Sequence, residues 1–347
     1  MSLPHPSLIG VPTETLDKIF KMLDYKEILG LRQVCKRLKN FVDIYRPDFR
    51  HKSIFVDVIS NGYIVKFATD LKEEVKIEMK MKKTRKTKKM KKMTSEDGDD
   101  QMWRPLETLL AHQKSQLEAF RLRCESKKNV GVFDRMLGRI QTILTSQNRQ
   151  LRAKRFETYA QNEDQIMMVL PYLDPDTLES ICLEDEHPKN PRIVETPMEI
   201  GKVKECDQFK QATGFLADNV FINAKIEDFT HFRSLAVNID TLKMSDVVSI
   251  KEKFCDYPIK NFVSIGYRNL VEDAKVPEGY TPIPDHWPTA EYDLKGYMYP
   301  IPNTKKNLQL KICTFKSRIQ NNYVHIGIYD PPPKKGPLIL GANLGFN

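Results

Sequence analysis

Apolar residues recur at helical spacing over residues 9–46, the first patterned segment of the chain. Four of them fall at i, i+3, i+4 and i+7 and share one face of a helix: Leu16, Ile19, Phe20 and Leu23. A second apolar series runs from Ile28 to Val42, and Asp24 between the two series is suited to cap a helix. Pro12 suits a first helical turn, where its missing N–H costs nothing. The pattern predicts a helical hairpin or a three-helix unit.

The period changes from helix-like to strand-like over residues 52–80. Apolar and polar positions alternate in two runs, at residues 54–58 and 63–67. Asn61-Gly62 lies between the runs, and both residues tolerate the positive φ that a tight hairpin turn requires. A third alternating run follows at residues 75–79. We therefore expect a β-hairpin extended by one more short strand.

Residues 102–330 alternate between helical and strand-like patterns, with helices expected from Pro105, around residues 133–144 and over residues 166–173. A pattern apolar-x-x-apolar-x-apolar recurs, most clearly from three starting points: Leu117, Leu178 and Phe232. The interval from 178 to 232 is twice the 27 residues that separate 232 from a weaker start at 259. Such spacing, with one strand and one helix in each repeat, is typical of leucine-rich-repeat solenoids.

The predicted fold class is therefore mixed α+β and α/β. A helical N-terminal unit and a β-hairpin segment precede a degenerate leucine-rich-repeat-like α/β solenoid, with a parallel sheet inside and helices outside. Residues 271–300 are rich in proline and aromatic side chains, which indicates an ordered loop or an interaction surface. Strands are expected near residues 308–312 and 324–328, and a loose tail over 331–347 after three consecutive prolines.

Composition indicates a globular protein without a membrane span. Of the 347 residues, 40% are hydrophobic and 29% are charged. No apolar run approaches the roughly 20 residues that a bilayer-spanning helix needs, and the N-terminus lacks the pattern of a signal peptide. The six cysteines are scattered without C-x-x-C spacing, which indicates reduced thiols and no zinc site. We expect an intracellular protein of the cytoplasm, the nucleus or both.

The net charge of +9 comes from one short tract. Residues 76–92 carry ten basic side chains and one acidic one, so the rest of the chain is formally neutral. Residues 81–101, which add an acidic run to the tract, cannot bury a core and are expected to form a disordered linker. Six basic residues are candidates for a nuclear-import signal or an anionic contact, with a plain solvated loop as the alternative: Lys82, Lys83, Arg85, Lys86, Lys88 and Lys89.

Nucleic acid is not an expected partner, because the tract lacks the interleaved aromatic residues that stack on single-stranded bases. A nuclear or nucleic-acid-binding factor that acts through residues 76–92 stays a second hypothesis.

Motifs of catalysis are missing from the sequence: there is no glycine-rich phosphate loop, no G-x-S-x-G and no H-E-x-x-H. The seven histidines are isolated, and His286 beside Trp287 is the one histidine that we would inspect. We therefore expect a protein that is not an enzyme and that has no cofactor and no metal.

Residues 9–43 resemble an F-box almost position by position, most specifically over LRQVCKRL at 31–38. Val11, where leucine is common, and Gly30 inside the second helix depart from that family's pattern. The resemblance implies that apolar helical faces dock on a Skp-type adaptor, which links the chain to a cullin and a RING protein. Nine residues would form or support that surface, with Cys35 as a small packed residue rather than a nucleophile: Pro12, Leu16, Ile19, Phe20, Leu29, Leu31, Val34, Cys35 and Leu38.

Two later segments, VLPYLDPDTLESI at 169–181 and IEDFTHF at 226–232, resemble hallmarks of the FTH domain. This domain follows the F-box in a large nematode family, the F-box A type, and the likeness covers roughly residues 105–270. It implies a domain that binds a substrate or partner without chemistry of its own. Together the two resemblances imply a substrate-recruiting adaptor of a cullin-type (SCF) ubiquitin ligase. The alternative is an F-box protein that binds the ligase scaffold without a role in degradation.

Overall fold

The computed structural model divides the chain into two compact units. The first unit comprises Met1–Glu186 together with Gly201–Ala212, and the second comprises His187–Ile200 together with Thr213–Asn347. Within these units the structure describes residues 10–60, 62–68, 74–80, 96–184, 197–246, 248, 262–271, 281–282, 292–300, 307–315 and 322–329. Among these residues, no helix combines the length and the apolar character that a membrane crossing requires.

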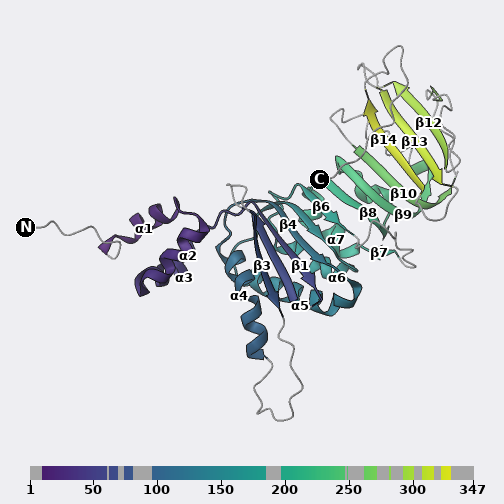
Figure 1. Cartoon of the computed structure of the whole chain (residues 1–347). Helices are drawn as coiled ribbons and strands as arrows, with labels where there is room; N and C mark the ends of the chain where they lie inside the picture. Colours follow the sequence, from purple (N-terminus) through teal and green to yellow (C-terminus); the bar gives the residue numbers. More distant parts are fainter. Residues whose placement is uncertain are drawn as a thin grey trace, which may run out of the picture. The chain divides into compact units, whose positions relative to one another are not determined.

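The first unit begins with three short helices, as the apolar periodicity predicts. They are α1 (Thr13–Phe20), α2 (Tyr25–Val34) and α3 (Lys36–Tyr45) (Figure 1). Asp24 caps α2, as expected, whereas Pro12 lies at the N-cap of α1 rather than inside its first turn. The three helices each bury a narrow apolar stripe, which is the arrangement that their spacing dictates.

A mixed sheet follows the helices in the first unit. Its strands run in the order β6-β5-β4-β1-β2-β3. Their bounds are β1 (Ser53–Ile59), β2 (Gly62–Ala68), β3 (Glu74–Lys80), β4 (Leu117–Cys124), β5 (Ala153–Thr158) and β6 (Ser180–Leu183). Strands β1, β2 and β3 pair antiparallel, which confirms the hairpin, whereas β1, β4, β5 and β6 pair in parallel. β1 is therefore the strand at which the pairing changes direction.

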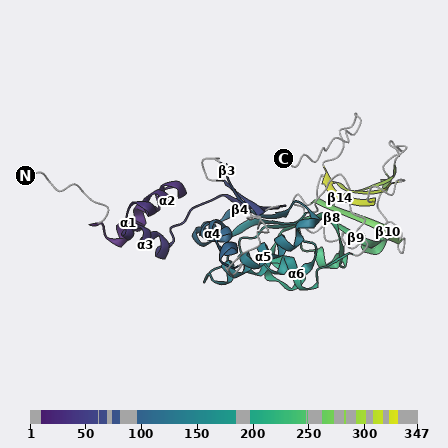
Figure 2. The ribbon, with the colours of Figure 1, turned by 60° about the horizontal axis from the view of Figure 1, so that its bottom comes forward.

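Helices cover one face of this sheet, and no described helix covers the other. Figure 2 shows α4, α5 and α6 together beneath the strands of the first unit. The helices after the sheet begins are α4 (Glu96–His112), α5 (Val130–Thr145), α6 (Glu163–Met167), α7 (Gly201–Glu205) and α8 (Asp207–Gln211), with 3-10 turns η2 (Lys127–Asn129) and η3 (Leu170–Tyr172). Val56, Phe120 and Phe156 are fully buried on the helix side, while Arg123 and Arg155 on the other side are exposed. The hydrophobic core of the unit lies between the strands and these helices.

The prediction that a helix opens at Pro105 was wrong, and α4 overlaps the end of the linker expected over residues 81–101. The helix begins at Glu96 and holds Pro105 in its interior. Trp103 is buried and stacks on Tyr63 of β2 at 4.7 Å, and this packing offsets the roughly 3 kcal/mol that an interior proline costs. Residues 81–95, with the six basic candidates, lie outside the described residues.

The single helix expected over residues 166–173 was also wrong. α6 ends at Met167, and the chain continues as the separate 3-10 turn η3. Pro171 fits the break, because proline has no N–H to continue the α-helical hydrogen bonds but is tolerated in the first turn of a new helix. The apolar residues of the pattern, Ile166, Val169 and Leu170, are nevertheless all buried.

The second unit holds a sheet in the order β11-β12-β13-β14-β10-β9-β8, with β7 paired to β8. The bounds are β7 (Met198–Glu199), β8 (Gly214–Asn223), β9 (Ser234–Lys243), β10 (Phe262–Val271), β11 (Thr281–Pro282), β12 (Tyr292–Pro300), β13 (Asn307–Phe315) and β14 (Asn322–Tyr329), and η4 is Ile226–Phe229. β7 to β10 pair in parallel, and β10 to β11 pair antiparallel by way of β14, β13 and β12.

The proline-rich segment was expected as an ordered loop or an interaction surface, and within it Tyr292–Pro300 forms strand β12 between β11 and β13. Proline is confined to the last position of β12 and the last of β11, where a missing N–H is tolerated. Parallel strands with helices fit the predicted mixed fold class, while a regular solenoid repeat stays a prediction. His286, Trp287 and the tail at 331–347 lie outside the described residues.

Candidate functional site

The three N-terminal helices owe their boundaries to local capping. The carbonyl of Pro12 accepts hydrogen bonds from the amides of Thr15 and Leu16, which starts α1. At α2, the Asp24 carboxylate accepts from the Glu27 amide and the Glu27 carboxylate accepts from the Asp24 amide, both at 2.8 Å. This reciprocal capping box satisfies two amides that a helix start leaves without partners. Capping therefore stabilises the start of these helices, which are too short to be stable in isolation.

Three of the nine residues predicted for the docking surface lie inside the helical unit. Leu16, Phe20 and Leu38 are each about 1% exposed. The Phe20 ring contacts Phe41 of α3 with 5.0 Å between ring centroids, and Ile28 of α2 is fully buried. These residues support the surface from within, because a side chain without exposed atoms contacts no partner directly.

The other six predicted residues reach the surface to different extents. Pro12 and Val34 are exposed, and Val34 has 67% of its area in contact with solvent. The remaining four are half-buried: Ile19, Leu29, Leu31 and Cys35. Leu31 and Val34 are three residues apart on α2 and so share a face of that helix. Exposed apolar side chains that gather on one surface are a feature of docking surfaces.

Sequence reasoning did not single out three further exposed apolar residues on these helices. Met22 follows α1, and Ile44 and Tyr45 end α3, with exposed fractions of 82%, 73% and 52%. Ile44 lies off the stripe that buries Leu38 and Val42 in α3, and this departure from the helical period was the signal that the sequence offered. The helical unit thus presents more apolar surface than the predicted set alone.

Polar contacts tie the helices to one another on the same unit. Arg32 of α2 reaches Asp43 of α3 through two hydrogen bonds, of 2.6 Å and 3.2 Å. The Arg32 guanidinium holds the pKa of the Asp43 carboxyl below its ordinary value. Arg37 donates to the carbonyl of Val11 at 2.7 Å, which anchors the segment that leads into α1. These exposed pairs orient the helices more than they stabilise them.

An aromatic cluster lies where the helices meet the sheet of the same unit. Tyr25 of α2 contacts Phe67 of β2 edge to face, with ring centroids 5.0 Å apart. Phe49 stacks on His112 of α4 at 4.3 Å, and His51 contacts Tyr25, Phe49 and Phe67. The carbonyl of Pro47 accepts a hydrogen bond from His112 Nδ1 at 2.9 Å. The cluster packs the helices on the sheet through side chains as well as through the connecting chain.

Burial holds both histidines of this cluster neutral. His51 is fully buried, and this burial lowers its pKa to about 4 against a weaker opposing effect of Asp48. Burial also lowers the pKa of His112, which the hydrogen bond to Pro47 partly opposes. Among the described residues, the His51 ring contacts aromatic rings alone, and His112 adds its bond to the Pro47 carbonyl, so the two histidines serve packing.

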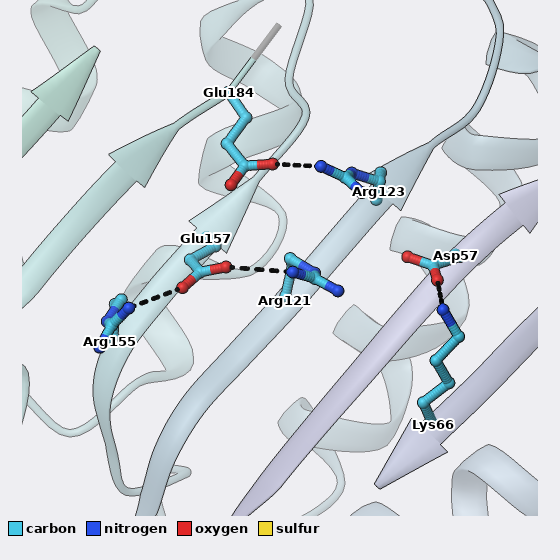
Figure 3. Close-up of polar contacts among 7 residues, drawn as sticks. All are labelled: Asp57, Lys66, Arg121, Arg123, Arg155, Glu157 and Glu184. Carbon is cyan, nitrogen blue, oxygen red and sulfur yellow. Dashed lines mark hydrogen bonds and ion pairs between the residues drawn. The ribbon is translucent and has the colours of Figure 1, made fainter. Parts of the chain in front are cut away.

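A second group of polar residues lies on the helix-free face of the first unit's sheet (Figure 3). Lys66 Nζ is 2.9 Å from Asp57, Arg123 is 3.1 Å from Glu184, and Glu157 lies between Arg121 at 3.8 Å and Arg155 at 3.3 Å. Neighbouring strands bring these residues together, since Arg121 is directly opposite Glu157 in the β4–β5 register. We name this group the charged sheet face: Asp57, Lys66, Arg121, Arg123, Arg155, Glu157 and Glu184.

The charged sheet face was not predicted, because it depends on parallel pairing between distant strands. Arg121 and Arg123, and also Arg155 and Glu157, stand two residues apart and therefore point to one side of their strands. That spacing was the only signal available in the sequence. Burial chiefly, and the charge of Glu184 next, raise the pKa of Glu157 above its ordinary value.

The contacts in the helical unit and on the charged sheet face are apolar packing, hydrogen bonds and ion pairs. In the described part of the chain, no cluster of three or more His, Cys, Asp or Glu residues could hold a metal ion. The helical unit offers apolar contact area, and the charged sheet face offers ion pairs, so both arrangements suit binding. The six basic candidates at residues 82–89 lie outside the described residues.

Comparison with known protein families finds two domains in the chain. A model of the F-box domain matches residues 8–50, which span α1, α2 and α3. A model of the FTH domain matches residues 134–273, which begin within α5 and include both segments noted in the sequence, 169–181 and 226–232. No curated protein and no solved structure matches the chain. This comparison confirms both resemblances stated from the sequence, with the F-box before the FTH domain.

Proposed function

Since the chain is an F-box protein that also carries an FTH domain, we propose that it recruits a protein substrate to a cullin-type ubiquitin ligase. The F-box domain supports a role as a substrate adaptor through binding of a Skp-type adaptor. Residues 9–43 bind that adaptor, and the part of the chain after the F-box, including the FTH domain, binds the substrate. The protein acts within the cell and performs no bond chemistry itself.

The mechanism in this proposal is proximity. One end of the chain is held on the ligase scaffold while the other holds the substrate, so ubiquitin transfer becomes effectively intramolecular. Such a device needs two independent binding surfaces on one folded chain. The exposed apolar residues of the helical unit provide the first surface, with Val34 as its most exposed predicted member.

The exposure of Val34 is the observation that carries the docking assignment. An isolated globular helix would bury its large apolar residues, whereas Val34 stays 67% exposed beside half-buried Leu31 on the same face of α2. Leu16, Phe20 and Leu38 position these helices from the interior. Burying an exposed valine against a partner yields roughly 1.5 kcal/mol or more, which makes it an anchor.

The test is a Val34→Asp variant of the full chain, co-purified with a Skp-type adaptor and analysed by size exclusion. A carboxylate at an apolar anchor removes about 2 kcal/mol of binding free energy or more, so we expect affinity to fall about thirtyfold or more. The control is Gln33→Asp, which adds the same charge at the neighbouring exposed position, on another face of α2. Equal adaptor binding by wild type and Val34→Asp would overturn the docking assignment.

Degradation is a separate property from scaffold binding. A chain that binds the adaptor but presents no substrate would act as an assembly factor or a decoy. Reconstituted ubiquitination of proteins that co-purify with the wild-type chain separates these cases. Ubiquitin transfer that disappears with Val34→Asp supports the recruiting role, and adaptor binding without any transfer contradicts it.

A further inference from the structure

The charged sheet face has nearly balanced formal charge but unequal exposure of its two signs. The acidic side chains of Asp57 and Glu157 are only 8% and 10% exposed. The basic side chains of Arg155 and Arg123 are 55% and 46% exposed, and each lies over a carboxylate that it contacts. A partner that approaches this face therefore meets Arg155 and Arg123 first, with Glu184 beside Arg123 at 34% exposure and the other two carboxylates beneath.

The arginines keep donors for a second carboxylate. A guanidinium carries five N–H donors, and the ion pair of Arg155 to Glu157 and that of Arg123 to Glu184 each use a single nitrogen. Buried Glu157 holds Arg155 in place, and half-buried Glu184 holds Arg123, which lowers the entropy that binding would cost. Glu157 contacts both Arg121 and Arg155 and so links the two sides of the face.

The apolar part of this face points to a polypeptide partner rather than to nucleic acid. The Arg121 guanidinium lies over the ring of Phe55, 4.2 Å from its centroid, so this ring is already stacked. Phe55 and Arg121 are directly opposite each other in the β1–β4 register. Grooves that bind single-stranded nucleic acid present open aromatic faces for the bases, and the described residues of this face offer none besides Phe55.

We propose that the charged sheet face binds an acidic polypeptide segment of the recruited substrate, through carboxylates that pair with Arg123 and Arg155. Lys66 and Arg121, which are 29% and 23% exposed, extend the basic surface across β2 and β4. The assignment rests on the proposed function and adds the chemical class of the substrate segment. Charge-assisted pairs with arginine are directional, so Arg123 and Arg155 can each fix the position of one carboxylate of such a segment.

The probe is a fluorescein-labelled peptide that alternates glutamate and serine, followed by fluorescence anisotropy with the full chain bound to its Skp-type adaptor. We expect the double variant Arg123→Gln/Arg155→Gln to bind this peptide about tenfold more weakly than wild type. The matched control is Lys128→Gln/Arg135→Gln, which removes two exposed positive charges in η2 and in α5, a helix on the covered face. The control is expected to bind within about twofold of wild type.

Three outcomes would overturn the proposal. They are equal weakening by both double variants, equal binding of a glutamine–serine peptide by the wild type, and tighter binding of a single-stranded oligonucleotide at the same face. Size exclusion of each preparation with the adaptor shows separately whether the F-box helices still bind the adaptor. Loss of peptide binding with an intact adaptor complex concerns the sheet face alone, whereas a wild type without an adaptor complex contradicts the proposed function.

Discussion

Replacing Phe20 by alanine tests whether this side chain acts through the stability of the helical unit rather than through direct contact with a partner. Phe20 is about 1% exposed and packs against Phe41. Truncating such a side chain costs about 3–5 kcal/mol, which equals the whole stability of a small packed unit, about 3–5 kcal/mol. If the unit is stable by about 3 kcal/mol and the substitution removes about 4 kcal/mol, the unit stays folded in roughly one sixth of the molecules. The apparent affinity for a Skp-type adaptor then falls about sixfold.

Two measurements check this prediction on the full chain. Isothermal titration with the adaptor gives the affinity, and hydrogen exchange over residues 13–45 gives the fraction of folded helical unit. Lys18→Ala is the control, because Lys18 is exposed on the same helix α1. If Phe20→Ala keeps both the exchange protection and the affinity of the wild type, the assignment of Phe20 to the interior is refuted.

Two further predictions concern stability. Gly266→Ala places a Cβ 1.7 Å from Asn238 Oδ1 in the β9–β10 pair, so it should lower the free energy of unfolding by about 1–3 kcal/mol in a denaturant titration. Gly138→Ala in α5 is the matched control, because its Cβ meets nothing within 4 Å, and it should raise the free energy of unfolding by up to about 1 kcal/mol. If Gly266→Ala melts like the wild type, the close packing of Asn238 is refuted. Burial lowers the pKa of His51 to about 4 in the folded chain, so the unfolded chain takes up the proton first as pH falls. The free energy of unfolding should therefore drop by about 3 kcal/mol between pH 6.5 and pH 4. His51→Phe should flatten this pH profile, measured by thermal melting, leaving the part due to His112; an unchanged slope would contradict the buried neutral state.

Local chemistry made the helices and strands of the first unit predictable. The stripe through Leu16 and Phe20 set α1, and Asp24 marked the start of α2. The alternation at residues 54–58 and 63–67 set β1 and β2, because a half-buried strand needs that period. Each of these signals involves residues within a few positions of one another.

Features that depend on distant partners were not predictable. Trp103 keeps α4 helical before Pro105 by packing on Tyr63, forty residues earlier in the chain. The charged sheet face depends on the β4–β5 register, which places Arg121 beside Glu157. For the docking surface, the sequence identified which helices carry it, but the structure was needed to place Phe20 inside and Val34 outside.

The change of pairing direction at β1 has a consequence for folding during synthesis. Its antiparallel partner β2 follows within a few residues, and a hairpin of this kind closes in about 1–10 microseconds. Its parallel partner arrives much later, since Ser53 pairs with Ala119, 66 residues further along. At about 5–20 residues per second, the ribosome needs about 3–13 seconds to supply that stretch. For those seconds one edge of β1 stays open in the nascent chain, and an open strand edge is a template for pairing with another chain.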